Sequence, residues 1–399
     1  MNPKRILLLA GVALLAAGCT MAPKYARPDA PVPAGWPQGV AYQDNQSAHG
    51  APQARDLAWQ EFFADRKLRQ LIEMSLQSNR DLRLAALNVE RARAIYGIQR
   101  AELLPAVDVA ATGSRAQVPG DLSGTGRRET VESYRADLGV LSWEVDFFGR
   151  IRSLKDRALQ EFLASDEARR AAQILLVSSV ANGYLTLATD REKLALAEST
   201  LVAQEQAYTL VKRRHELGLA TDIDLFRAQT PVDTSRREVV RFQQIVALDQ
   251  NGLDLLLGRP TPAHLLPADL GGVRPPRAVS AGTTSEVLLS RPDVRQAEHR
   301  LRAANADIGA ARAAFFPRIS LTATTGTASA ELTNLFKQGS ATWAFAPQAA
   351  MPVFDARVWS ALKASEAQQK IAVTQYEKAI QDAFREQLLA LEPGLALPF

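Results

Sequence analysis

The only cysteine of the 399-residue chain, Cys19, stands where its thiol could be acylated. Lys4 and Arg5 precede an apolar run over residues 6–17, and Gly18 directly precedes the cysteine. The run is too short to cross a bilayer comfortably as a helix, and its basic flank is typical of an export signal. Small residues before the thiol leave the adjoining peptide bond accessible to a signal peptidase. The basic flank and the short apolar run therefore predict a signal peptide over residues 1–18.

The residues around this bond, Leu15-Ala16-Ala17-Gly18-Cys19, resemble a bacterial lipobox, with the leucine one position earlier than usual. In that motif the thiol takes a diacylglyceryl group, so the resemblance implies a covalent lipid on Cys19, and it implies palmitate as well. Thr20, rather than an aspartate, follows the cysteine. This resembles the sorting signal of lipoproteins that are delivered to the outer membrane. A plain signal peptide with an incidental thiol is the alternative.

Side chains that could support catalysis or bind a metal are scattered. The four histidines, His49, His215, His264 and His299, lie far apart, and no cysteine–histidine pair has the spacing of a zinc site. The sequence also lacks GxxxxGK, GxSxG and HExxH motifs. Its 47 basic and 43 acidic residues are mixed along the chain and form no basic patch. We therefore expect no enzyme activity, no catalytic or metal site, no cofactor beyond the lipid, and no nucleic-acid partner.

The segments that would position such groups begin with an arm. Residues 19–56 are rich in Pro, Ala and Gly and have no sustained periodicity, which predicts an extended, lipidated arm. From Leu57 to about Leu104, apolar residues recur at helical spacing. Asn79 interrupts this run and Pro105 ends it, so we expect two helices.

After this proline the period changes to two, which predicts a β-hairpin over about 105–148. Val109 lies on an apolar face and Asp108 on a polar one, and the alternation shifts phase near Leu141. A phase shift of this kind indicates a bulge or a bend. One apolar and one polar-to-small face suit a strand between lipid and a wet lumen. An ordinary half-buried soluble hairpin would give the same local pattern.

The next segment is unusually long for a single helix. Residues 154–216, 63 in number, are dominated by strong helix formers and contain one glycine. One helix of this length would extend about 95 Å, so it must belong to a coiled coil or a helical tube. Gly218 is a good C-cap residue, and Thr221 or Asp222 can cap a returning helix. We predict a long helical hairpin over about 154–257.

The pattern of the first half then returns after a Pro/Gly-rich linker over residues 260–291. Matching segments lie 212 residues apart: Asp81-Leu82-Arg83 with Asp293-Val294-Arg295, and Leu103-Leu104-Pro105 with Phe315-Phe316-Pro317. Phe354 corresponds to Phe148 at a shorter offset of 206 residues. Because order and spacing both recur, the sequence predicts an internal duplication.

The duplication predicts a first structural repeat over 57–259 and an incomplete second repeat over 292–386. The second repeat is predicted to hold a β-hairpin over about 317–354 and a long helix that begins near Val358. Residues 387–399 form an atypical tail, whose prolines should end that helix. Since the second repeat is much shorter than the first, we expect a shifted reading frame or an early stop.

Each repeat supplies one hairpin, so the chain offers four candidate membrane strands. A membrane barrel needs at least about eight strands, because an open sheet edge is not tolerated in lipid. One chain therefore cannot close a barrel. Three chains would give twelve strands, and their long helices would continue the tube below the membrane.

Several runs of residues resemble the TolC-like outer-membrane factors, most closely the lipoprotein NodT/OprM branch. These runs are Trp59-Gln60-Glu61-Phe62-Phe63, Asn79-Arg80-Asp81-Leu82-Arg83, Trp143-Glu144-Val145-Asp146-Phe147-Phe148-Gly149-Arg150, Arg291-Pro292-Asp293 and Ala311-Arg312-Ala313-Ala314-Phe315-Phe316-Pro317. The resemblance implies a mainly α fold with membrane β-hairpins. It also implies a homotrimeric channel-tunnel with a twelve-stranded barrel in the outer membrane and a helical body in the periplasm.

The same resemblance implies partners and a role. Such channels serve tripartite efflux pumps, together with a periplasmic adaptor (membrane fusion) protein and an inner-membrane RND transporter. They export drugs and other small amphipathic compounds and perform no chemistry of their own. The alternatives are a truncated, non-conducting or inactive product, and a lipid-anchored periplasmic coiled-coil protein without a pore.

The turn of the helical hairpin resembles the tip motif of this family. The matching residues are Arg214, Gly218, Thr221, Asp224, Leu225, Ala228 and Gln229. The resemblance implies that they form the periplasmic tip, where the adaptor docks and the entrance closes. Helix capping by Gly218, Thr221 and Asp224, with ordinary packing of Leu225, is an equally good account of these residues and is compatible with docking.

Overall fold

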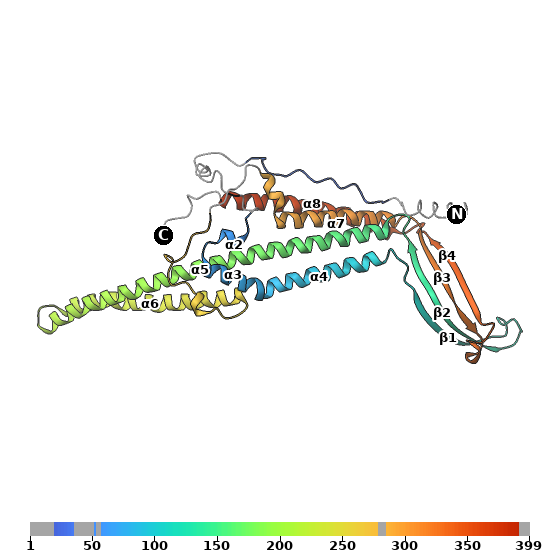
Figure 1. The fold of residues 1–399 in the computed structure, drawn as a ribbon, viewed down its shortest axis with the longest axis horizontal. Coiled ribbons are helices and arrows are strands. Elements are labelled where there is room, and N and C mark those ends of the chain that lie inside the picture. The colour runs from blue at the N-terminus through green and yellow to red at the C-terminus, as the bar shows by residue number, and fades with distance from the viewer. Residues whose placement is uncertain (1–19, 36–51, 53–56, 278–284, 391–399) are drawn as a thin grey trace. The chain divides into compact units, whose positions relative to one another are not determined.

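A computed structural model describes residues 20–35, 52, 57–277 and 285–390 (Figure 1). The predicted signal peptide, Cys19 and residues 391–399 of the tail lie outside the described residues. The described chain forms two compact units. The first comprises residues up to 31, 89–165 and 294–381, and the second comprises residues 32–88, 166–293 and those from 382 onward.

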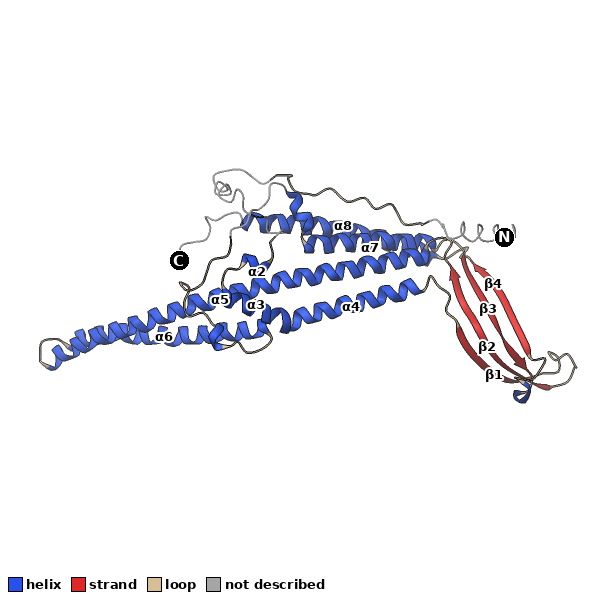
Figure 2. Ribbon diagram, in the orientation of Figure 1, coloured by secondary structure: helices blue, strands red, loops and turns tan. Residues whose placement is uncertain are grey.

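The first unit contains the four strands, which form one antiparallel sheet in the order β1-β2-β3-β4 (Figure 2). The strands are β1 (Asp108–Val118), β2 (Glu129–Val145), β3 (Arg318–Ser329) and β4 (Ala341–Ala350), with the short η5 (Leu332–Asn334) in the loop before β4. Both hairpins lie where the period-two pattern predicts them. The helical segments of this unit belong to α4 (Arg80–Ala101), α5 (Arg150–Glu216), α7 (Pro292–Ala313) and α8 (Ala356–Ala390).

The element boundaries reproduce the predicted duplication. Helices α4 and α7 begin at Arg80 and Pro292 and end at Ala101 and Ala313, so both ends differ by 212 residues. Helices α7 and α8 lie side by side (Figure 1), and Phe315 meets Trp359 edge to face with ring centroids 4.8 Å apart. The second repeat therefore builds the same sequence of helix, hairpin and helix as the first.

The predicted phase shift in β2 is a β-bulge. Val140 lies opposite Ala323 on β3, and Trp143 lies opposite Leu321. A three-residue step on β2 thus faces a two-residue step on β3. Since strand side chains alternate between faces, the additional residue keeps Trp143 on the same face as Val140.

The second unit is helical and has an apolar core of its own, as the first unit has around Leu301, Tyr376 and Ile380. It contains α2 (Trp59–Phe62), α3 (Arg66–Ser78), the remainder of α5, α6 (Asp222–Leu257) and the short η3 (Ala263–Leu265) and η4 (Ser285–Ser290). Its largest fully buried side chains include Leu71, Ile72, Tyr184, Leu187 and Leu257. Burial, with the charge of Asp65 nearby, raises the pKa of Tyr184 to about 12.

The predicted break at Asn79 is present, and its side chain explains it. Asn79 is buried, donates from Nδ2 to the Leu256 carbonyl at 2.9 Å, and accepts from the Leu82 backbone N–H at 2.9 Å. It thus caps α4 and ties the α3–α4 junction to the end of α6. The prediction of two helices was incomplete, because Asp65 accepts from the Leu68 N–H and starts α3 separately from α2.

The linker predicted over 260–291 contains the short helices η3 and η4, and part of it belongs to the core. Leu265 and Leu266 are buried against the apolar cluster. The Asp254 carboxylate accepts bonds from the Thr261 N–H and hydroxyl, and Arg191 donates to the Pro267 carbonyl at 2.7 Å. Local composition could not show these contacts, since they join the linker to distant residues.

Helix α5 is the only described helix that is long and apolar enough to cross a membrane by length and composition. Its apolar residues include Leu176, Val177, Val180 and Leu187, and these side chains pack in the core of the second unit. These buried side chains account for part of that apolar stretch, whereas Ile174 and Leu175 on the same helix are exposed.

Helix α8 continues past the predicted boundary at residue 386. It ends at Ala390, so the first four residues of the predicted tail, 387–390, are helical. The helix-breaking residues of the tail, Pro393 and Gly394, begin only three residues later, so residues 387–390 contain nothing that opposes helix formation.

Candidate functional site

The strand register separates two chemically different faces of the sheet. Val109 lies opposite Leu138, which lies opposite Thr325, which lies opposite Trp343. Residues directly opposite one another share a face. In its helix-proximal part, the apolar face defined in this way carries Val109, Leu138, Val140, Trp143, Val145, Ile319, Leu321, Trp343 and Phe345. Towards the loops that join the strands, the same face carries Thr325, Thr327 and the pair Arg115 and Glu132.

The opposite, polar face carries charged, hydroxyl and small side chains. Asp137 lies opposite Ala110 and Gly326, and Gly326 lies opposite Thr342. The residues of this face include Asp108, Thr112, Arg135, Asp137, Glu144, Ser320, Thr324, Thr342 and Gln348. A sheet with one such face and one apolar face can separate lipid from a water-filled lumen.

The sheet is open at both edges in a single chain. Strand β1 pairs only with β2, and β4 pairs only with β3, among the strands that the structure describes. An unpaired edge leaves a row of backbone N–H and C=O groups without partners, which lipid does not tolerate. A membrane sheet of this design therefore needs further copies to close.

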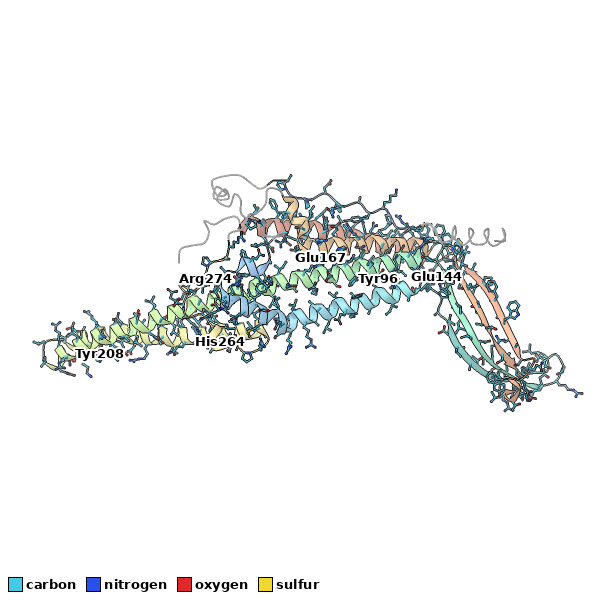
Figure 3. The ribbon with its side chains drawn as sticks, in the orientation of Figure 1. Tyr96, Glu144, Glu167, Tyr208, His264 and Arg274 are labelled. Carbon is cyan, nitrogen blue, oxygen red and sulfur yellow. The ribbon has the colours of Figure 1, made fainter. Side chains whose placement is uncertain are left out.

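Charged pairs fix the junction between β2 and α5. Arg150 donates from Nε and Nη2 to both oxygens of Glu144, at 2.8 and 2.7 Å (Glu144 is labelled in Figure 3). Asp146 accepts from the backbone N–H groups of Ile151 and Arg152, at 3.2 and 2.9 Å, in the first turn of α5. These contacts orient the helix relative to the strand from which it emerges.

The predicted tip is the turn between α5 and α6, which lie side by side (Figure 1) and are joined by an ion pair between Glu205 and Arg236 at 3.1 Å. Gly218 has a φ of +73°, its N–H donates to the His215 carbonyl, and the Leu219 N–H donates to the Arg214 carbonyl, both at 2.8 Å. This is the Schellman arrangement, which favours glycine at the left-handed position.

The other predicted tip residues begin α6. Thr221 accepts from the Asp224 N–H at 3.2 Å, and Asp224 accepts from the Thr221 N–H at 3.0 Å, forming a capping box. These bonds lower the pKa of Asp224. The structure thus brings together Arg214, Gly218, Thr221 and Asp224. Leu225, half-buried, and Gln229, exposed, lie one and two turns along α6, on either side of Ala228.

Sequence reasoning missed two features of the turn. His215 Nε2 lies 2.7 Å from Asp222 Oδ1, so a contact joins the end of α5 to the start of α6. Four exposed apolar side chains also surround the turn, those of Leu217, Leu219, Ile223 and Phe226. The signal for the second feature was present in the sequence as apolar residues in and beside a turn, where polar residues are usual.

The arm predicted over 19–56 is extended in its described part and is held on α7. Glu298 accepts from the Tyr25 hydroxyl at 3.1 Å and from Arg27, and Asn305 donates to the Pro23 carbonyl at 2.8 Å. Cys19 precedes the first described residue, so its environment lies outside the described residues. Within the described ranges no cluster of three or more His, Cys, Asp or Glu side chains could hold a metal ion.

Comparison with known proteins identifies the family. The family model described as "Outer membrane efflux protein" matches residues 71–259 and 283–390. The probable efflux pump outer membrane protein TtgC of Pseudomonas putida is 47% identical over 385 residues, covering 96% of this chain and 79% of that protein. Outer membrane protein OprJ of Pseudomonas aeruginosa is 45% identical over 378 residues, covering 94% and 78%.

A solved structure agrees with these sequences. The open-state MtrE outer membrane channel of Neisseria gonorrhoeae superimposes with a TM-score of 0.79 at 36% identity, over 94% of this chain and 81% of that one. The predicted resemblance and the predicted channel-tunnel fold are therefore confirmed. The chain belongs to the outer membrane efflux protein family and is an outer-membrane channel subunit of tripartite efflux systems.

Proposed function

We propose that this chain forms a homotrimer and conducts small amphipathic compounds passively across the outer membrane, without chemistry of its own. The observation that carries the proposal is the four-stranded sheet with one apolar face, one polar face and two open edges. Three copies supply twelve strands, enough to close around a wet lumen. Among the relatives, one protein of Pseudomonas putida is named a toluene efflux pump outer membrane protein and another an antibiotic efflux pump outer membrane protein.

The tip is proposed as the docking surface for the periplasmic adaptor, which links the channel to an inner-membrane RND transporter. Two observations support this. The Schellman turn and the capping box give the tip a defined backbone shape. The exposed side chains of Leu217, Leu219 and Phe226 are apolar, and apolar residues at an exposed turn favour burial against a protein partner.

A covalent lipid on Cys19 is proposed to anchor the N-terminal arm in the outer membrane. Support comes from the small residues before the cysteine and from the contacts of Tyr25 and Arg27, which hold the following arm on α7. Radiolabelled palmitate should enter the wild-type chain, and Cys19→Ala should abolish the labelling. Labelling of the alanine variant would contradict the assignment.

The channel function is tested by complementation and conductance. In a strain that lacks its own efflux channel, this chain should restore resistance to lipophilic drugs, and the purified trimer should conduct in planar bilayers. Trimers that neither conduct nor restore resistance would refute the proposal.

The docking proposal has its own variants. Leu219→Ser and Phe226→Ser should abolish resistance while conductance persists, because the pore is unchanged and only the adaptor contact is lost. The control is Thr209→Ala, an exposed position on α5 whose hydroxyl donates to the Glu205 carbonyl. Full resistance with both serine variants would rule out docking at this turn.

A further inference from the structure

A stacked aromatic pair joins the two repeats where the sheet meets the helices. Phe148 follows β2 and Phe316 precedes β3, and their rings stack with centroids 4.7 Å apart and planes 19° apart. The pair lies at the helix-proximal end of neighbouring strands that pair directly. The stacked rings therefore link β2 and β3 at the helix-proximal end of their pairing.

The internal duplication supplies an equivalent for each partner. Subtracting the repeat offset of 212 from Phe316 gives Leu104, which precedes β1 as Phe316 precedes β3. After the hairpins the offset between the repeats is 206 residues, because α5 begins at Arg150 and α8 at Ala356. Adding 206 to Phe148 gives Phe354, which follows β4 as Phe148 follows β2. Leu104 and Phe354 are thus the second copy of the stacked pair.

Within one chain these equivalents are left exposed. Phe354 is 94% exposed and Leu104 is 71% exposed, whereas Phe316 in the formed pair is 37% exposed. Val353, beside Phe354, is 96% exposed. Large apolar side chains this exposed mark a contact with protein or with lipid. Their equivalence to a pair that packs ring on ring within the chain favours a protein contact.

The sheet topology places the missing partner. Leu104 flanks edge strand β1 and Phe354 flanks edge strand β4, both at the helix-proximal end of the sheet. Closure of a ring of identical sheets sets β4 of one copy antiparallel to β1 of the next, as β2 already lies against β3. The end of β4 then meets the start of the neighbouring β1.

We propose that Phe354 of each copy packs on Leu104 of the next copy, repeating between chains the Phe148–Phe316 contact within each chain. A groove of about 360 Å³ beside Leu104 is the space that receives the ring. Its walls are apolar at Ile98, Ala106, Trp143 and Ile151 and polar at Glu102, Ser142, Glu144 and Arg150. Six quasi-equivalent contacts, three within chains and three between them, then encircle the junction of barrel and tunnel.

The proposal fixes the strand register between copies. Trp143 lies opposite Leu321 within the chain. Adding 206 to Trp143 gives its equivalent on β4, Ala349, and subtracting 212 from Leu321 gives its equivalent on β1, Val109. Ala349 of one copy should therefore lie opposite Val109 of the next. Both residues lie on the apolar face, as a continuous lipid-facing surface requires, so the register and the aromatic contact agree.

Cysteine cross-linking tests the contact in the full-length chain, purified in detergent. With a short thiol-reactive cross-linker, the double variant Leu104→Cys/Phe354→Cys should give covalent dimers and trimers on denaturing gels. The matched control is Phe148→Cys/Phe316→Cys, which should cross-link only within a chain and run as a monomer. Each single variant shows whether Cys19, the native cysteine, contributes any product.

A trimer that yields no more linked product with the double variant than with the single variants would overturn the proposal and leave the channel function intact. A preparation with no trimer at all would overturn both.

A double-mutant cycle gives a second test that needs no cysteine. Leu104→Ala and Phe354→Ala should each lower the temperature at which the trimer dissociates, and the combined variant should lower it no further than the stronger single change. Phe336→Ala, at an exposed phenylalanine in the β3–β4 loop, is the matched control and should cause no shift. Additive shifts from Leu104 and Phe354 would show that the two residues do not touch.

Discussion

Arg27 and Glu298, 271 residues apart in sequence, form a two-pronged ion pair, with Nε to Oε1 and Nη2 to Oε2 both at 3.0 Å. Arg302 donates to the same carboxylate at 2.7 Å, and its guanidinium lies over the ring of Tyr25. The buried carboxylate of Glu298 therefore joins α7 to the arm that leads back to Cys19. A pull on the anchored end of the arm would be transmitted to this pair.

Replacing Glu298 by glutamine should release the arm. The variant loses charge-assisted bonds to Arg27 and Arg302, each of a kind that stabilises by about 2 kcal/mol. Trypsin should then cut after Lys24, which Tyr25 follows, faster than in the wild type. Asp29→Asn, at an exposed carboxylate on the same arm, is the control and should leave the cleavage rate unchanged. An unchanged rate in the Glu298 variant would mean that the backbone contacts alone hold the arm.

The same pair should weaken in acid. Burial tends to raise the pKa of Glu298, but the bonds from Arg302 and Arg27 outweigh it, so its pKa lies below the ordinary 4.5. Because the folded pKa is lowered, the stabilisation is present above pH 4.5 and is lost as the pH falls through the lowered value.

Gly258 should tolerate no side chain. It ends α6 at a φ of +70°, and a Cβ there would lie 2.5 Å from the Ser78 carbonyl oxygen. Gly258→Ala should destabilise the chain by more than the roughly 1–2 kcal/mol that a left-handed alanine costs, because the contact with Ser78 must also open. Thermal unfolding of the purified chain measures the loss.

Gly252, six residues earlier in α6, is the matched control. It is exposed, has a helical backbone, and a Cβ there would meet nothing within 4 Å. Gly252→Ala should leave stability unchanged or raise it by up to about 1 kcal/mol, the helix-propensity difference between the residues. Equal effects from the two substitutions would refute the assigned role of Gly258.

Features encoded in short stretches were predictable from the sequence, and features formed by distant residues were not. The capping of α6 by Thr221 and the bulge near Leu141 follow from local spacing alone. The bond from Arg27 to Glu298 could not be predicted, since many carboxylates were available to pair with that arginine. Leu265 was assigned to a linker because prolines and glycines surround it, yet its side chain completes a core built from other segments.

Asp249 on α6 should make stability rise as the pH falls. Its Oδ2 is buried and has no hydrogen-bond partner among the described residues while both it and Asp190 are ionised. Burial is the largest cause that raises the pKa of Asp249. The negative charge of Asp190 and a hydrogen bond with that carboxyl group raise it further, whereas the positive charge of Lys193 lowers it. Between pH 3.8 and the raised value the folded state binds more protons than the unfolded state, so stability is lost as the pH rises through that window.

Asp249→Asn should remove this dependence and stabilise the chain at neutral pH, since the amide stays uncharged. Chemical unfolding at a series of pH values measures both effects. Asp233→Asn, at an exposed α6 carboxylate paired with Arg236, is the control and should leave the dependence in place. A pH dependence that survives in the Asp249 variant would assign the effect to another group.

Thr221 can separate helix capping from adaptor docking at the tip. Serine keeps the hydroxyl that accepts from the Asp224 N–H, whereas alanine removes it and should destabilise the start of α6 by about 1 kcal/mol. If Thr221 acts only as a cap, Thr221→Ser should keep both the hydrogen-exchange protection of the first α6 turn and binding to the adaptor, and Thr221→Ala should reduce both. If the adaptor contacts the threonine methyl group itself, the serine variant should keep its protection and bind more weakly. We expect the first outcome, because the hydroxyl also donates to Asp224 at 2.7 Å and is thus committed to the turn.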